Sequence, residues 1–110
     1  MAASAARLNT TVATGFVGIF SIELFFPDSG SLKDKRMHLR SVKAQLANRV
    51  GCSIAEVDYH ETWQRSRLTL ACVTREAGEA DRLLDEAERW LWGQPFEVTA
   101  VERTTVTLDD

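Results

Sequence analysis

The sequence predicts an α+β protein with a ferredoxin-like βαββαβ sandwich: a four-stranded antiparallel sheet with two helices on one face. Three observations lead to this fold class. The chain has 110 residues, enough for one domain. Its apolar content of 45% and charged content of 26% are those of an ordinary globular protein. Four segments suited to strands alternate with two segments of helical periodicity, in the order required for this fold.

The first strand is expected over residues 16–26, ending at Pro27. One face carries an apolar core set, and the other is mixed, with Val17, Ile19, Ser21 and Glu23. The stretch before it, residues 1–14, lacks the basic start and apolar core of a signal peptide. We therefore expect a flexible tail over residues 1–14 and a single domain over residues 15–108.

Two helices follow from apolar residues at helical spacing. Ser31 is a suitable N-cap for a helix over residues 32–50, and Gly51 is placed to end it. A second helix is predicted over residues 77–92. The apolar stripe of this second helix consists of Ala80, Leu83, Leu84, Ala87, Trp90 and Leu91.

The remaining strands are predicted over residues 52–60, 65–74 and 96–108, with the first and third strands at the centre of the sheet. On the third strand, Leu68, Leu70 and Cys72 form the expected buried face. No apolar run approaches the ~20 residues of a membrane span. Cys52 and Cys72 show no CxxC spacing and are expected to be reduced. These features favour a cytoplasmic protein with no membrane contact.

Positive charge is concentrated on the first helix. The chain carries a net charge of −3, yet residues 31–50 hold six basic residues and one acid, which gives this segment +5 and the remainder −8. Lys33 and Lys35 in the first turn oppose the helix dipole, which favours a bound anion. We predict phosphate contacts from Lys33, Lys35, Arg36, Arg40 and Lys43.

An intramolecular interpretation of this basic helix is also open. The second helix carries five acids (Glu79, Asp81, Asp85, Glu86 and Glu88), and both helices are expected on the same face of the sheet. The basic residues could then pair with these acids across the helix contact, each exposed pair contributing at most ~1 kcal/mol.

The stretch EVDYHETWQR, residues 56–65, has the residue types of an active site. Glu56, Asp58 and His60 alternate along a strand and could line a ligand or metal site. Their spacing of about 7 Å is too wide for one ion without further ligands. The alternative is a polar hairpin in which Trp63 covers the end of the core and Arg65 pairs with a nearby acid. No metal, cofactor or catalytic residue is predicted, because no nucleophile or phosphate-loop motif is present.

The uncovered face of the sheet is predicted to be partly apolar. It lacks the paired aromatic residues with which RNA-recognition domains of this topology stack bases. Instead it carries Val17, Ile19, Ala71 and Val73. We expect a homodimer through this open sheet face.

Three sequence pieces together resemble one family. They are VGIFSIEL (residues 17–24), SLKDKR (31–36) and AEVDYHETWQR (55–65), and they are similar to the YlxP-like family, domain of unknown function family 503. The resemblance covers nearly the whole chain outside the tail. It implies a ferredoxin-like fold, no established enzymatic activity and genes that commonly lie among those for translation initiation and ribosome maturation factors.

The function expected from residues and resemblance together is that of a non-enzymatic accessory protein. Its partner would be ribosomal RNA or a ribosomal subunit, contacted by the basic helix and by a second surface of Trp63, Gln64 and Arg65. The alternative is a homodimeric small-ligand or metal-binding module that uses Glu56, Asp58 and His60.

Overall fold

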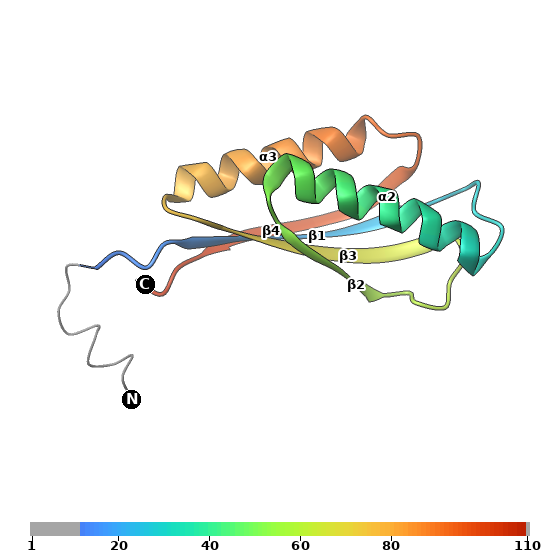
Figure 1. Cartoon of the computed structure of the whole chain (residues 1–110), viewed down its shortest axis with the longest axis horizontal. Coiled ribbons are helices and arrows are strands. Elements are labelled where there is room, and N and C mark those ends of the chain that lie inside the picture. The colour runs from blue at the N-terminus through green and yellow to red at the C-terminus, as the bar shows by residue number, and fades with distance from the viewer. Residues whose placement is uncertain (1–11, 110) are drawn as a thin grey trace.

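The computed structural model describes residues 12–109. It confirms the predicted order of elements, and each boundary lies within two residues of the predicted one (Figure 1). The elements are β1 (Phe16–Phe25), α2 (Leu32–Val50), β2 (Ser53–Asp58), β3 (Arg65–Thr74), α3 (Ala77–Trp92) and β4 (Glu97–Val106). The tail predicted for residues 1–14 falls mostly outside the described residues. Thr14, within them, donates a hydrogen bond from its hydroxyl to Asp109 at 2.7 Å.

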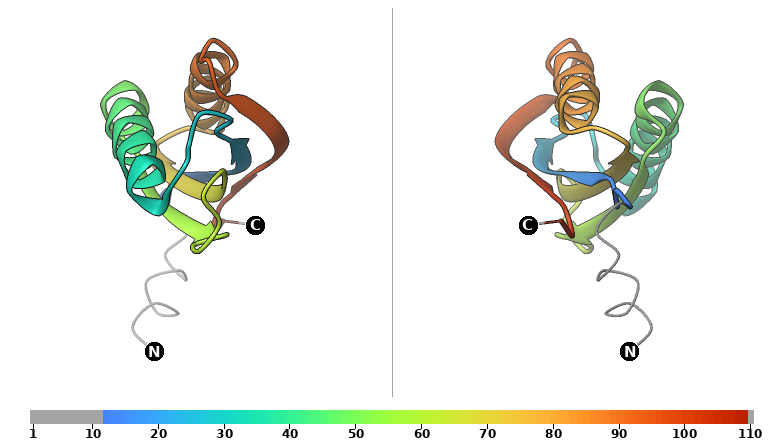
Figure 2. Two further views of the ribbon diagram at one scale, coloured as in Figure 1. Left: turned by 90° about the vertical axis from the view of Figure 1, so that its right-hand side faces the viewer. Right: turned by 90° about the vertical axis from the view of Figure 1, so that its left-hand side faces the viewer.

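The four strands form one antiparallel sheet in the order β2-β3-β1-β4, so β1 and β3 are central, as predicted. Both helices cover the same face and leave the other face open (Figure 2). This arrangement confirms the ferredoxin-like α+β sandwich.

The core lies between the sheet and the helices. Phe20, Ile22 and Leu24 of β1 are completely buried, and α3 packs closely over the same strand. At Gly18 a Cβ atom would lie 3.2 Å from the Cys72 sulfur and 3.3 Å from Leu84, so any larger residue would require these side chains to shift. The other core members are Phe26 after β1, Leu39, Val42, Leu46 and Val50 of α2, Leu68, Leu70 and Cys72 of β3, and Leu84, Ala87 and Leu91 of α3. Each large side chain contributes about 1.5–3 kcal/mol on burial.

The ends of α2 follow the capping signals in the sequence. The Ser31 hydroxyl accepts a hydrogen bond from the Asp34 backbone at 3.0 Å, and the Asp34 carboxylate accepts one from the Gly30 backbone at 3.0 Å. Gly51 ends the helix in a left-handed conformation with φ of 60°. The two hydrogen bonds of Asp34 tie the connection before α2 to the first turn of the helix.

The second strand ends earlier than the sequence predicts. Its pairing with β3 is interrupted by a register shift between Glu56 and Asp58, and Tyr59 adopts a φ of 64°. A left-handed tyrosine costs about 1–2 kcal/mol. Five hydrogen bonds hold it. Its N–H donates to Asp58 and its hydroxyl to Glu23, its carbonyl accepts from Lys35 and from the Thr62 N–H, and its hydroxyl also accepts from Arg65. The alternation predicted through residue 60 therefore stops at Asp58.

Candidate functional site: a basic helix face and a polar sheet face

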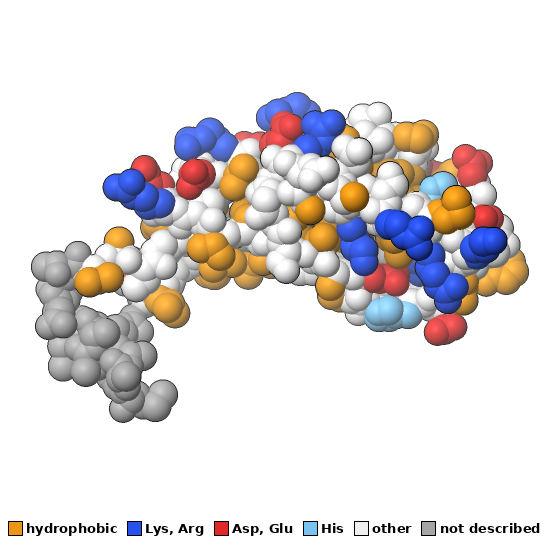
Figure 3. All heavy atoms as spheres, viewed as in Figure 1, with side chains coloured by type: hydrophobic (Ala, Val, Ile, Leu, Met, Phe, Trp, Pro, Cys, Tyr) orange, Lys and Arg blue, Asp and Glu red, His pale blue; other side chains and the backbone are white. Residues whose placement is uncertain are grey.

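Four cations form a stripe along one side of α2, which we call the basic face: Lys33, Arg36, Arg40 and Lys43. Their spacing of i, i+3, i+7 and i+10 keeps them on one side of the helix. Lys43 is half-buried and the other three are exposed. Lys and Arg side chains gather along this helix in the space-filling view (Figure 3). Within residues 12–109, none of the four makes an ion pair or a side-chain hydrogen bond.

Lys35 does not belong to this face, contrary to the sequence prediction. Its side chain is 2% exposed, and its ammonium group lies 2.9 Å from the Glu56 carboxylate. The reason is its position on the helix: Lys35, Leu39, Val42 and Leu46 fall at i, i+4, i+7 and i+11, on the apolar stripe. Glu56 neutralises the charge that opposes the helix dipole at this position. Lys35 is therefore already engaged and is not available to a phosphate group.

The acids of α3 are engaged elsewhere than on the basic face. Arg103 of β4 lies 2.9 Å from Asp85 and 3.3 Å from Glu88. Glu86 lies 2.6 Å from Arg89 of its own helix. Among the described residues, the ion pair that joins α2 to α3 is Arg49–Glu86, at 3.6 Å. Pairing between the two helices therefore does not neutralise the basic face.

Glu56, Asp58 and His60 are not brought to one site. The Glu56 carboxylate points beneath α2, where it also accepts a hydrogen bond from Ser66 at 2.7 Å. Asp58 accepts one from the Tyr59 backbone, and the His60 imidazole Nε2 lies 3.1 Å from the Glu56 carbonyl oxygen. Within residues 12–109, no three His, Cys, Asp or Glu side chains are grouped closely enough to hold a metal ion.

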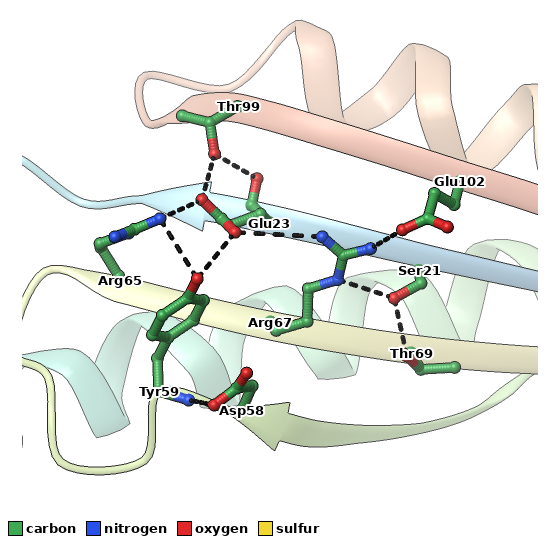
Figure 4. A network of polar contacts seen from close by, with 9 residues as sticks. All are labelled: Ser21, Glu23, Asp58, Tyr59, Arg65, Arg67, Thr69, Thr99 and Glu102. Atoms are coloured by element: carbon green, nitrogen blue, oxygen red, sulfur yellow. Dashed lines mark hydrogen bonds and ion pairs between the residues drawn. The ribbon is translucent and has the colours of Figure 1, made fainter.

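A polar network occupies one half of the open sheet face, and Glu23 is its centre (Figure 4). Its carboxylate accepts hydrogen bonds from Arg65 at 2.5 Å, Thr99 at 3.1 Å and the Tyr59 hydroxyl at 3.2 Å. The hydrogen bond from Arg65 is the largest influence on the pKa of Glu23, and it lowers that pKa despite the opposing effect of burial. The sequence prediction that Arg65 pairs with a nearby acid is confirmed.

The other half of the open face is apolar. The pairing register places Val73, Val17 and Val106 in one row across β3, β1 and β4. The next row contains Ala71, Ile19 and Thr104. Val73 is 77% exposed, so this half is uncovered among the described residues.

The three residues of the predicted second surface take different roles. Gln64 fastens the β2–β3 hairpin to the end of β1, because its carbonyl accepts from the Phe26 N–H at 2.7 Å and its side chain donates to the Pro27 carbonyl at 3.0 Å. Arg65 joins the Glu23 network and lies over the Tyr59 ring at 4.5 Å. Trp63 remains 55% exposed.

Both cysteines are free thiols, Cys72 buried and Cys52 partly so. Burial raises the pKa of each thiol, which keeps both protonated and poorly nucleophilic. The structure contains no helix long and apolar enough to cross a bilayer within its described part.

The structure is an α+β sandwich of ferredoxin-like topology, and the four cations of its basic face have no ion-pair partner within residues 12–109. The chain belongs to the family described as "Protein of unknown function (DUF503)", whose model matches residues 17–104. It is 28% identical over 88 residues to the "Uncharacterized protein YlxP" of Bacillus subtilis, covering 80% of this chain and 96% of that protein.

Two solved structures of designed proteins are also similar. The "De novo designed protein Ferredog-Diesel" has a TM-score of 0.44 at 18% identity, covering 83% of this chain and 88% of the design. The "De novo designed protein Foldit4" has a TM-score of 0.42 at 14% identity, covering 84% and 96%.

Proposed function

We propose that this protein is a non-enzymatic accessory protein that binds RNA in a ribosomal setting through the basic face of α2. One observation carries the proposal. Four cations lie on one side of one helix, and none has an acidic partner within residues 12–109. Such a row matches the regular negative charge of a nucleic-acid backbone. The family resemblance supports the ribosomal setting.

The distribution of the other charged residues favours RNA contact on the basic face and not elsewhere on the surface. Twelve of the thirteen Lys and Arg residues lie in the described chain, and six of these have no ion pair. Besides the four of the basic face, these are Arg75 and Arg82, which lie among acids at the start of α3. The chain outside residues 31–50 carries a net charge of −8, so phosphate is attracted most strongly to the basic face.

The test is RNA binding by fluorescence anisotropy across a series of salt concentrations, with a labelled ribosomal RNA fragment. If four phosphates are contacted, log K falls with log[salt] with a slope of about −3 to −4. Arg36→Gln/Arg40→Gln is expected to make that slope shallower by about 1.5–2. Co-sedimentation with ribosomal subunits at low and moderate salt then identifies the particle.

Arg75→Gln/Arg82→Gln is the matched control, because it removes the same charge from two exposed arginines that have no ion pair within residues 12–109, Arg82 on α3 and Arg75 just before it. This control is expected to keep the wild-type slope. Equal losses in the two double variants would assign the effect to net charge and contradict a specific face. Absence of salt-dependent RNA binding by the folded wild-type protein would contradict the function itself.

We also propose that the open sheet face packs against a second copy of this chain. The support is the pair of apolar rows, which a two-fold axis would bring against each other in a self-complementary contact. Sedimentation equilibrium is expected to give a dimer for the wild type and a monomer for Val73→Asp. Met37→Asp is the control, because Met37 is an exposed apolar side chain on α2, away from the open sheet face. A monomeric wild type at all concentrations would refute it.

A further inference from the structure

Trp63 is a large aromatic side chain that contributes little to the packing of the fold. It is 55% exposed, and within residues 12–109 its indole makes neither a hydrogen bond nor a ring contact. The other two tryptophans have partners: Trp90 packs edge-on against Phe96, and the Trp92 indole N–H donates to Glu88 at 3.3 Å.

The backbone that presents Trp63 is fixed on both sides. Tyr59, at the start of the hairpin, is held by Lys35, whose ammonium donates to its carbonyl. Gln64 makes two hydrogen bonds to the end of β1, and Arg65 is tied to Glu23. An exposed aromatic ring on a rigid support loses little entropy when a flat ligand stacks on it.

Trp63 borders a shallow hollow of ≈ 510 Å³. Phe25 supplies a second aromatic side chain and Thr62, Gln64 and Arg65 supply polar groups. Ser29 and Gly30 complete the lining. None of the lining residues is acidic. The volume is that of an ordinary small-ligand site, and the composition suits a flat, polar-edged ring that is joined to a negative group.

The hollow adjoins the basic face. Gly30 immediately precedes Ser31, the N-cap of α2, and Lys33 lies in the first turn. In the end-on view, the start of α2, the β1–α2 connection and the β2–β3 hairpin lie together at one end of the molecule (Figure 2, left). The basic face extends from this end for about 15 Å, given the 1.5 Å rise per residue.

We propose that Trp63 and Phe25 stack an unpaired base of the same RNA whose phosphates contact the basic face. The inference rests on the proposed function and specifies the kind of RNA that is bound. The RNA element must contain an unpaired base, as in a loop, a bulge or a single-stranded end, because a base within a duplex cannot reach the hollow. Its backbone runs along α2, and Lys33 lies between the stacked base and the phosphates bound by Arg36 and Arg40.

The experiment compares a single-stranded oligouridine of about 12 nucleotides, within the site sizes of single-strand binders, with a blunt duplex of equal length. Stacking of one base contributes about 1–3 kcal/mol, so Trp63→Ala is expected to weaken single-strand binding by about 5–150-fold. The salt slope and the duplex affinity stay unchanged. Trp63→Phe retains most of the affinity because it keeps an aromatic face.

Trp92→Ala is the matched control, since Trp92 is exposed to a similar degree, 59%, at the C-terminal end of α3 and does not line the hollow. It is expected to bind both RNAs as the wild type does. If Trp63→Ala binds as tightly as the wild type while Arg36→Gln/Arg40→Gln still reduces the slope, stacking is refuted and the basic face stands. If the wild type binds neither RNA at low salt, both proposals fall. Far-UV circular dichroism verifies that each variant is folded.

Discussion

The cations on the open face of the sheet are paired with acids, whereas the cations on the basic face of α2 have no acidic partner within residues 12–109. On the sheet, Arg65 and Arg67 each contact Glu23, and Arg67 also reaches Glu102. On α2, the four cations of the basic face have no such partner within residues 12–109. A paired cation is part of the fold, whereas an unpaired one contributes little to stability and remains available to an external anion. Substitutions should therefore separate stability from binding.

Lys35 sharpens this comparison, because it stands on the same helix as the basic face but is paired and buried. Lys35→Met is expected to lower the free energy of unfolding by about 3 kcal/mol, since it leaves the Glu56 carboxylate unpaired beneath α2. Guanidinium unfolding followed by circular dichroism measures the loss.

Lys33→Met is the matched control, two residues away and exposed. It is expected to change the free energy of unfolding by no more than about 0.5 kcal/mol. A double variant, Lys35→Met/Glu56→Leu, should recover much of the loss because it removes the unpaired carboxylate. Equal destabilisation by the two lysine variants would show that the ion pair is not what holds Lys35.

The features of the fold that depend on local sequence patterns could be predicted from the sequence. The order of elements, both helices and the caps Ser31 and Gly51 follow from apolar spacing and local chemistry. The predictions that depend on contacts between distant segments were incomplete. Lys35 was assigned to an anion site because its partner, Glu56, lies on another element. Its place on the apolar stripe was the available signal for burial.

The candidate site shows the same division. The four residues of the basic face could be predicted, because helical spacing places them on one side of α2. The exposure of Trp63 was not predicted by the polar-hairpin interpretation, in which Trp63 covers the end of the core, since its side chain is 55% exposed. Glu23 could not be recognised as the centre of the polar network, since its partners Arg65, Tyr59 and Thr99 come from the β2–β3 hairpin and from β4. The register shift that ends β2 at Asp58 also depends on tertiary contacts to Tyr59.

The contribution of the paired charges on the sheet to stability can be tested by varying the pH, because it depends on the ionised Glu23 carboxylate. Its pKa is lower in the folded state, so its contribution to stability is present above the unfolded value near pH 4.5 and is lost as the pH falls through the folded pKa. The difference in melting temperature between wild type and Glu23→Gln is therefore expected to be largest near neutral pH and to shrink below about pH 4.5.

Glu102→Gln is the control for that measurement, because it also removes a carboxylate that pairs with an arginine of the network but whose side chain is 79% exposed. Its effect on the melting temperature should be small throughout, as for other exposed pairs. A difference for Glu23→Gln that does not vary with pH would indicate a packing defect instead of the lost charge.

Substitution of Lys33 is expected to have the smallest effect on the free energy of unfolding, and it tests directly whether the cations of the basic face are free to bind an anion. Its charge lies in the first turn of α2, where a cation opposes the helix dipole and an acid favours it. Lys33→Glu should therefore raise the free energy of unfolding by about 0.3–1 kcal/mol at low salt, while it weakens RNA binding. Lys43→Glu, in the interior of the helix, should weaken binding without the gain in stability.

A loss of stability in Lys33→Glu would mean that the fold uses this lysine, and the basic face would then have one fewer free cation. A gain, together with weaker binding, would show that a position unfavourable for the helix is suited to holding an anion.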